Sequence, residues 1–110
     1  MDDFEKEIKI SFLEEAEQNL TDVEQCFLSL EQSSNDDSVL EKIFRLAHNL
    51  KGSARAVGFV EMGEFTHVLE SLLLKLKTKE FSITSSIVSL LLRCNDCLVQ
   101  WVETLKQDLD

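Results

Sequence analysis

The stretch Leu40–Gly58, LEKIFRLAHNLKGSARAVG, contains the pattern that decides the fold. Its apolar residues recur every three or four positions, and this spacing places side chains on one face of an α-helix. Gly58 follows the last of them and is a predicted helix terminator, because glycine adopts the left-handed conformation of a helix end without a steric penalty. The stretch therefore predicts one amphipathic helix that ends in a tight turn.

Apolar residues have the same helical spacing in three further segments, one before this stretch and two after it. The first helix is predicted to begin at Asp2 or Asp3, and the last is predicted to have Ser82 or Thr84 as its N-cap. The four expected core stripes are Leu13, Ala16, Leu20, Val23, Phe27 and Leu30; Leu40, Ile43, Ala47, Leu50, Ala54 and Val57; Met62, Phe65, Leu69, Leu72 and Leu76; and Ile87, Leu91, Cys94, Leu98, Trp101 and Leu105. Short connections make consecutive helices antiparallel, so the sequence predicts an all-α fold, an up-down-up-down four-helix bundle that forms one domain over residues 1–110.

The composition supports a helical domain and excludes several classes of function. The 110 residues include no proline, no tyrosine and only three glycines, and 44% of them are hydrophobic. The net charge of −10 at pH 7 opposes binding to nucleic acid or to an anionic membrane surface. No apolar run approaches the roughly 20 residues needed to span a bilayer, and the acidic N-terminus lacks a signal-peptide pattern. We therefore expect a cytoplasmic domain that inserts into no membrane.

The three cysteines, Cys26, Cys94 and Cys97, do not indicate a disulfide framework. Their odd number and the missing secretory signal are typical of a reducing compartment. Cys94 and Cys97 form a CxxC pair inside a helical pattern, and no second pair exists to complete a zinc site. We expect these cysteines to be structural residues.

The charge is distributed unevenly along the chain. Residues 1–41 contain 13 acidic and two basic residues, whereas residues 42–55 contain four basic residues and no acidic one. A basic surface around His48 in an acidic protein is suited to a small anion. Arg45 and Arg55 are candidates for a partner-binding surface on this segment, and the acidic surface of the first helix is the alternative.

His48 lies in the middle of the second predicted helix and is followed one turn later by Lys51 and Gly52. Glycine in a helix interior costs about 1 kcal/mol relative to alanine, so its presence indicates a need for bare backbone at this position. An anion held by Lys51 and a partner that approaches His48 closely would both meet this need. We therefore predict that Gly52 gives access to the histidine.

The turn after the second helix brings further side chains toward His48. If the turn centres on residue 59, residues equally distant from it face each other, so that His48 faces Glu70 and Lys51 faces His67. The axes of packed helices are about 8–10 Å apart, which allows such side chains to touch. The sequence therefore predicts a cluster of His48, Lys51, His67 and Glu70 along one groove between two helices.

This cluster has the groups that a nucleophilic histidine needs. A neutral imidazole has one N–H and one lone pair, so a Glu70 carboxylate that accepts the Nδ1–H of His48 would leave Nε2 free to attack a phosphorus atom. Lys51 would balance the charge on the phosphoryl oxygens. Two alternatives stay open. His67 is either a flanking site residue or only an exposed neighbour, and the two histidines with Glu70 could instead hold a metal ion, although Lys51 would repel it.

The motif around His48 resembles that of the histidine phosphotransfer (HPt) domain family. It consists of His48-x-x-Lys51-Gly52-Ser53, preceded by Ile43-Phe44-Arg45-x-Ala47 and followed by Gly58-Phe59. The sequence is most similar to the N-terminal phosphotransfer domains of CheA-type chemotaxis histidine kinases. The similarity extends over nearly all 110 residues, through the acidic first helix with Phe12, Glu15 and Ala16 and the segment Thr66-His67-x-x-Glu70-x-Leu72-Leu73. Ser53 and Arg55 depart from the small, glycine-rich residues that are common after the motif.

The resemblance implies that His48 accepts a phosphoryl group, that Glu70 is its hydrogen-bond partner and that Lys51 and His67 flank the phosphoryl group. It implies a donor, an ATP-binding kinase domain that usually acts across a dimer. It also implies an acceptor, an aspartate on a CheY- or CheB-like response-regulator receiver that supplies Mg²⁺.

The chain has no nucleotide-binding motif of its own, so it is not expected to make phosphohistidine from ATP alone or to bind a cofactor. We expect it to be an N-terminal fragment of a larger histidine kinase. A free-standing phosphoryl carrier is one alternative, and a non-catalytic helical interaction module is the other.

Overall fold

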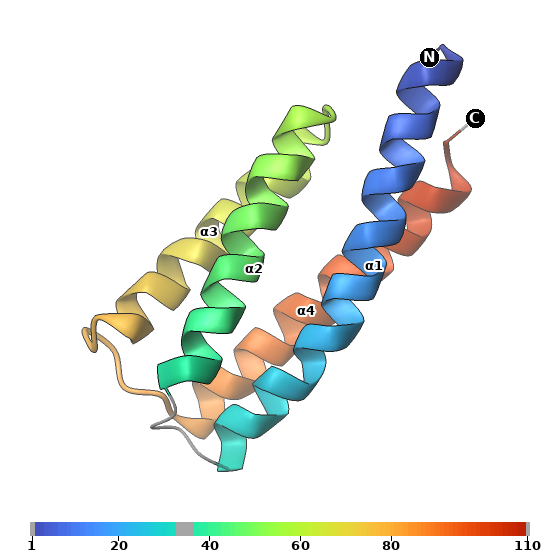
Figure 1. The fold of residues 1–110 in the computed structure, drawn as a ribbon. Coiled ribbons are helices and arrows are strands. Elements are labelled where there is room, and N and C mark those ends of the chain that lie inside the picture. Colours follow the sequence, from blue (N-terminus) through green and yellow to red (C-terminus); the bar gives the residue numbers. More distant parts are fainter. Residues whose placement is uncertain (1, 33–36, 110) are drawn as a thin grey trace.

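The computed structural model describes residues 2–32 and 37–109, and its four elements are all α-helices. They are α1 (Asp3–Gln32), α2 (Asp37–Ala56), α3 (Val60–Lys77) and α4 (Ser85–Gln107). Consecutive helices run in opposite directions, which gives the predicted up-down-up-down four-helix bundle (Figure 1). The bundle is elongated, with principal extents of 46 × 20 × 20 Å.

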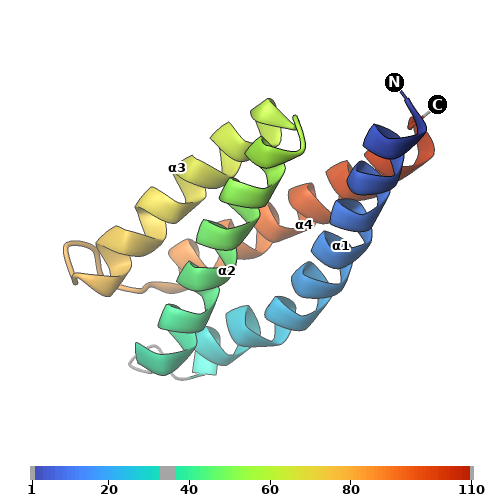
Figure 2. The ribbon, with the colours of Figure 1, turned by 45° about the horizontal axis from the view of Figure 1, so that its top comes forward.

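The bundle consists of two helix pairs that meet along α1 and α2. α3 packs mainly on α2, and α4 packs mainly on α1. Figure 2 shows α2 between α3 and α1, with α4 behind them. α2 therefore contributes to two surfaces, one shared with α3 and one shared with α1.

The stripes predicted for α1 and α2 form the centre of the core. All six predicted residues of α1 are buried, as are five of the six on α2, and only Val57 is partly exposed. Complete burial of a Leu, Ile or Phe side chain stabilises the folded state by about 1.5–3 kcal/mol. These two helices thus form the scaffold on which α3 and α4 are placed.

The stripe predicted for α4 is only partly confirmed. Leu91 and Leu98 are buried as predicted, but the other four members, Ile87, Cys94, Trp101 and Leu105, are only partly buried. For the first three of these, the next residue along the chain is buried instead: Val88, Asn95 and Val102. The large indole of Trp101 lies at the rim of the core, edge-on against Phe65 of α3, with the ring centroids 6.0 Å apart. The smaller Val102 side chain fills the centre, because close packing favours the residue whose volume fits.

Two residues of α3, Thr66 and Glu70, are buried although only apolar residues were predicted in the core. The hydroxyl of Thr66 donates a hydrogen bond to the Met62 carbonyl at 2.7 Å, which satisfies it inside the helix. Leu73 is fully buried, whereas the predicted Leu72 is only partly buried. A buried carboxylate requires hydrogen-bonded or charged partners. The partners of Glu70 lie on the neighbouring helix, α2.

The turn between α2 and α3 has the predicted glycine terminator. Gly58 has a φ angle of 97°, in the left-handed region that favours glycine. The next residue, Phe59, places its ring 5.8 Å from that of Phe12, and the Lys9 ammonium lies 5.5 Å from the Phe59 centroid. These contacts fix the turn against α1 and so determine how α2 and α3 face each other.

The predicted helix starts are confirmed at α1 and α4. α1 begins at Asp3. Thr84 is the N-cap of α4, and its hydroxyl accepts a hydrogen bond from the backbone N–H of Ile87 at 3.2 Å. Over the part of the chain that the structure describes, no helix has both the length and the apolar character needed to cross a membrane.

Candidate functional site

The surface where α2 meets α3 pairs residues that lie equally far from residue 59. Glu41 contacts Lys77, and His48 contacts Glu70. We call this surface the α2–α3 seam; it comprises Glu41, Phe44, His48, Lys51 and Arg55 of α2 and Gly63, Glu70 and Lys77 of α3. The predicted register of the two helices is therefore confirmed.

His48 presents an exposed imidazole whose two nitrogens lie in different surroundings. Its side chain is 60% exposed, whereas that of Glu70 is 11% exposed. Nδ1 of His48 is hydrogen-bonded to Oε2 of Glu70. Nε2 has no hydrogen-bond partner within residues 2–32 and 37–109. A neutral imidazole in this arrangement donates Nδ1–H to the carboxylate and keeps its lone pair on Nε2.

Lys51 also binds Glu70. Its Nζ lies 2.6 Å from Oε1, and its side chain is only 17% exposed. The sequence predicted that Lys51 faces His67, but the side chain that Lys51 contacts is Glu70. A lysine side chain is long and flexible, so its ammonium reaches along the seam to the buried carboxylate and not to the residue directly opposite. Each oxygen of Glu70 thus accepts a hydrogen bond from a different residue of α2.

These contacts keep Glu70 ionised. Burial acts to raise the pKa of the carboxyl group, but the hydrogen bonds from Lys51 and His48 outweigh it, and the pKa lies below its ordinary value of 4.5. An ionised Glu70 is a strong acceptor for the Nδ1–H of His48. The carboxylate therefore fixes the imidazole tautomer and the direction of the ring.

We predict that the stabilisation that Glu70 contributes is lost at acid pH. Because the folded-state pKa is lowered, the contribution is fully present above the ordinary value of 4.5 and disappears as the pH falls through the folded-state value. Urea unfolding of the wild type and of Glu70→Gln at about pH 6 and about pH 3 measures this effect, because the glutamine does not titrate. The stability advantage of the wild type should shrink at the lower pH. An equal difference at both pH values would contradict an ionised, hydrogen-bonded Glu70.

His67 does not join the cluster. It is exposed, and its side chain makes no hydrogen bond or ion pair within the part of the chain that the structure describes. Its backbone carbonyl accepts a hydrogen bond from the Ser71 hydroxyl at 3.0 Å. The structure thus brings together three of the four predicted residues, His48, Lys51 and Glu70.

The two candidate arginines lie on either side of His48 along α2. The Nε of Arg45 lies 3.3 Å from Glu41, one turn earlier, and its side chain is largely exposed. The Arg55 side chain lies across Gly63 of α3: a Cβ atom at Gly63 would be 2.6 Å from its Cγ. Both arginines are in contact with neighbours in the same seam.

Gly52 lies on the exposed surface beside His48 and has open space around it. Apart from the adjacent residues and the backbone of its own helix, no atom of residues 2–32 and 37–109 would lie within 4 Å of a Cβ atom at this position. No packing contact among the described residues therefore explains the glycine. The open space agrees with the predicted need for access from outside.

Lys77 is a seam residue that was not among the predicted site residues. It forms an ion pair with Glu41, and its Nζ lies 4.2 Å from the centroid of the Phe44 ring. Hydrogen bonds from Lys77 and Arg45 lower the pKa of Glu41. The pairing about residue 59 that predicts His48 opposite Glu70 also places Glu41 opposite Lys77, so the signal was present in the register.

The alternative of a metal site formed by the two histidines and Glu70 has no support in the structure. Within residues 2–32 and 37–109, no three His, Cys, Asp or Glu side chains are grouped so that they could hold a metal ion.

Comparison with known proteins gives the same picture over most of the chain. The family model described as "Hpt domain" matches residues 7–109. The chemotaxis protein CheA of Klebsiella aerogenes is 35% identical over 96 residues, which are 87% of this chain and 15% of that protein. CheA of Borreliella burgdorferi is 38% identical over 88 residues, which are 79% of this chain and 10% of that protein. The chain thus spans only a small part of the length of these relatives.

A solved structure shows the same architecture. The CheA phosphotransferase domain from Thermotoga maritima superposes with a TM-score of 0.85 at 29% sequence identity, covering 91% of this chain and 95% of that chain. The four-helix arrangement and the sequence similarity therefore agree over nearly the same residues.

Proposed function

Because the chain belongs to the Hpt domain family, we propose that it is the phosphotransfer module of a chemotaxis phosphorelay in which His48 carries the phosphoryl group. Family membership supports the general role of a phosphorelay carrier. The choice of His48 rests on one observation: its exposed imidazole is held at Nδ1 by Glu70, while Nε2 lacks a partner in the described residues. An oriented nucleophile that a second protein can reach is what phosphoryl transfer requires of its acceptor.

In the first proposed reaction, the Nε2 lone pair attacks the γ-phosphorus of ATP held by a kinase domain. The N–P bond forms as the bond between the γ-phosphorus and the bridging oxygen breaks, and ADP leaves with that electron pair. Nδ1 keeps its proton, because Glu70 accepts the hydrogen bond and stabilises the positive charge that develops on the ring. The product is a phosphohistidine with a protonated Nδ1.

In the second proposed reaction, a carboxylate oxygen of a receiver aspartate attacks the same phosphorus. The P–N bond breaks, its electron pair returns to Nε2, and the histidine is ready for another cycle. The receiver supplies Mg²⁺ for this step, and the Hpt domain binds no cofactor. A Glu70 carboxylate that holds Nδ1–H keeps the ring in the same orientation for both reactions.

Lys51 has two proposed roles. Its ammonium is hydrogen-bonded to Glu70 and so holds the carboxylate that orients His48. It also lies one helical turn from His48, where a positive charge favours the anionic phosphoryl group. Lys51→Ala is expected to weaken both phosphorylation and transfer. His67 is proposed only as a flanking residue.

The proposed partners are an ATP-binding kinase domain and a CheY- or CheB-like receiver domain. The relatives named CheA are several times longer than the matched segment, which supports a kinase domain in the same polypeptide or dimer. We therefore propose that the chain is the phosphotransfer part of a larger histidine kinase and acts in the cytoplasm, where ATP is available.

Phosphoramidate tests this proposal, because this small donor needs no cognate kinase. The wild-type chain should gain one phosphoryl group that is labile in acid and stable in alkali, as expected of an N–P bond. A CheY-type receiver with Mg²⁺ should then remove the group and become phosphorylated on aspartate. A folded chain that takes up no phosphate would contradict the carrier role and favour the non-catalytic interaction module.

Gly52→Ala is expected to stabilise the fold and to slow phosphoryl transfer. Alanine should raise the free energy of unfolding by about 0.4–1 kcal/mol, because the added methyl group has open space around it. The same methyl group should reduce the rate of transfer to a receiver by about tenfold, because it stands where the partner approaches His48. Urea unfolding and initial transfer rates measure the two effects. A stabilised variant with an unchanged rate would show that the partner does not need bare backbone here.

A further inference from the structure

The phosphoryl group proposed for His48 adds negative charge to a cluster whose own charges already cancel. The ammonium of Lys51 lies 2.6 Å from Oε1 of the ionised Glu70, and the Lys51 side chain is only 17% exposed. A phosphoryl group carries about 1.5 to 2 negative charges at pH 7, and the proton on Nδ1 of the ring offsets about one of them. About one negative charge therefore remains, and a further cation beside His48 would balance it.

The direction of the imidazole identifies the closest candidate for this cation. Side chains of an α-helix point back toward its N-terminal end, over the turn that precedes their own Cα. The ring of His48 therefore leans over the turn of α2 that contains Arg45, three residues earlier. Arg55 is two turns away in the C-terminal direction, and its side chain lies across Gly63 of α3. Because residues three apart on a helix are neighbours, with about 5–6 Å between their Cβ atoms, Arg45 is the arginine within reach of a phosphoryl group on Nε2.

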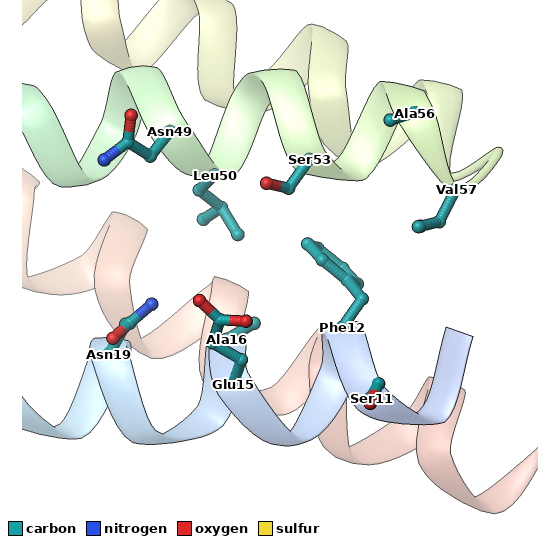
Figure 3. A pocket seen from close by; sticks show the side chains of 10 residues that line it. All are labelled: Ser11, Phe12, Glu15, Ala16, Asn19, Asn49, Leu50, Ser53, Ala56 and Val57. Carbon is teal, nitrogen blue, oxygen red and sulfur yellow. The ribbon is translucent and has the colours of Figure 1, made fainter. Parts of the chain in front are cut away.

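The side of α2 that faces α1 offers no such cation. Asn49 and Ser53 line a pocket of about 340 Å³ between α2 and α1 (Figure 3). Figure 3 shows Glu15 of α1 facing the same space. Among the described residues that line this pocket there is no lysine or arginine. The one charged group there is a carboxylate, which repels an anion, so the pocket does not supply the missing positive charge.

Arg45 is held only loosely in the unphosphorylated domain. Its side chain is 74% exposed, and its Nε lies 3.3 Å from Oε1 of Glu41, one turn earlier on α2. An exposed ion pair of this kind contributes little stability. The hydrogen bond uses Nε, which leaves the two terminal nitrogens of the guanidinium outside it. A guanidinium can bind two oxygens of one phosphoryl group at once, so Arg45 has the donors that such a group needs.

Glu41 can release Arg45 without losing its own counter-charge. Its second oxygen, Oε2, forms an ion pair with Lys77 of α3. The ammonium of Lys77 also lies 4.2 Å from the centroid of the Phe44 ring, which fixes it in the seam. A carboxylate that keeps one cation is not left uncompensated when the other leaves. Movement of the Arg45 side chain therefore costs the seam little.

We propose that Arg45 moves from Glu41 to the phosphoryl group once that group has formed on Nε2 of His48, and that it lengthens the lifetime of the phosphohistidine. The guanidinium donates hydrogen bonds to the phosphoryl oxygens and stays protonated, so no covalent bond changes in this movement. The inference rests on the proposed function and deepens it, because it names the residue that decides how long the carrier keeps its load.

The effect on lifetime follows from the charge of the phosphoryl oxygens. Loss of the group to water passes through a loose, metaphosphate-like transition state. Metaphosphate has a single negative charge, whereas the bound phosphoryl group has close to two. A cation on these oxygens therefore stabilises the phosphohistidine more than the transition state and slows hydrolysis.

Two substitutions at Arg45 and one on α4 test the proposal. Arg45→Gln removes the charge, and Arg45→Lys restores it without the two-pronged geometry. The matched control Arg93→Gln makes the same change at an exposed residue of α4, which packs mainly on α1. Each chain is loaded with phosphoramidate, freed of the donor, and followed at pH 7 as the phosphohistidine hydrolyses. Phosphorus-31 NMR then titrates the phosphoryl group of each loaded chain. The other charged groups of the site are the same in all chains: Glu41, Lys51, Glu70 and Lys77.

We expect the phosphohistidine of Arg45→Gln to hydrolyse about fivefold faster than that of the wild type. The pKa of its phosphoryl group should rise, because the lost guanidinium favoured the dianion. Arg45→Lys should recover part of both effects, and Arg93→Gln should match the wild type. A wild-type value of either readout in Arg45→Gln, or an equal change in Arg93→Gln, would overturn the proposal.

Two results of the loading step are equally informative. An Arg45→Gln chain that takes up no phosphate, while the wild type does, would overturn the proposal by placing Arg45 in the formation of the N–P bond. A wild-type chain that fails to load would instead refute the carrier function itself.

Discussion

His48→Gln should lose all detectable phosphorylation by phosphoramidate and by a CheA-type kinase core that lacks its own phosphotransfer domain. A glutamine side chain has no ring nitrogen with a free lone pair, so no N–P bond can form at this position. Its amide can still donate a hydrogen bond toward Glu70, which lies on the neighbouring helix. Because the His48 side chain is 60% exposed, the free energy of unfolding should change by no more than about 1 kcal/mol.

The chain has only two histidines, and this makes the control decisive. The control His67→Gln makes the same substitution at the other histidine, which is exposed on α3. It should retain acid-labile, alkali-stable labelling, while His48→Gln shows none. Label that persists in His48→Gln and disappears in His67→Gln would reverse the assignment. Circular dichroism of both variants establishes that the comparison is made between folded proteins.

Glu70→Ala should have the second largest effect, slowing phosphorylation by about a hundredfold. Without the carboxylate, no other side chain in the described part of the chain holds the proton on Nδ1 or directs Nε2 outward. The same change leaves the largely buried ammonium of Lys51 without its acceptor, and it should lower the free energy of unfolding by about 1–3 kcal/mol. Pre-steady-state labelling with a fixed kinase core and urea unfolding separate the two effects.

Glu41→Ala is the matched control for Glu70→Ala. Glu41 lies on the same seam and forms ion pairs with Lys77 and Arg45, but it is two helical turns from His48. Its loss should leave the labelling rate unchanged. An equal loss of rate in both variants would point to a general disturbance of the seam. An unchanged rate in Glu70→Ala would show that the carboxylate does not orient His48.

The central pair of the site could be predicted because it depends on backbone geometry alone. Gly58 limits the turn after α2 to a few residues, and a short antiparallel turn determines which residues face each other. His48 opposite Glu70 follows from that register. The partner of Lys51 does not follow from it, because the position of a flexible ammonium depends on the nearest buried anion. The nearest buried anion is Glu70, and its burial is known only from the three-dimensional structure.

Two other features depend on three-dimensional packing and could not be predicted from the helical spacing of apolar residues. On α4, the polar residue Asn95 is buried between α4 and α1 and donates a 3.5 Å hydrogen bond to the Leu20 carbonyl. A periodicity of apolar residues assigns such a residue to the surface. The pocket lined by Phe12 of α1 and Leu50 of α2 lies between two helices, and the spacing of residues within either helix does not specify it.

The division of the bundle into helix pairs has a consequence for its engineering. His48, Lys51 and Glu70 all come from the single hairpin of α2 and α3, whereas the outward residues of α1 take no part in holding the imidazole. Substitutions at the exposed positions of α1 are therefore expected to leave the orientation of the imidazole unchanged. Redesigning the exposed surface of α1 should therefore leave the hydrogen bonds from His48 and Lys51 to Glu70 intact.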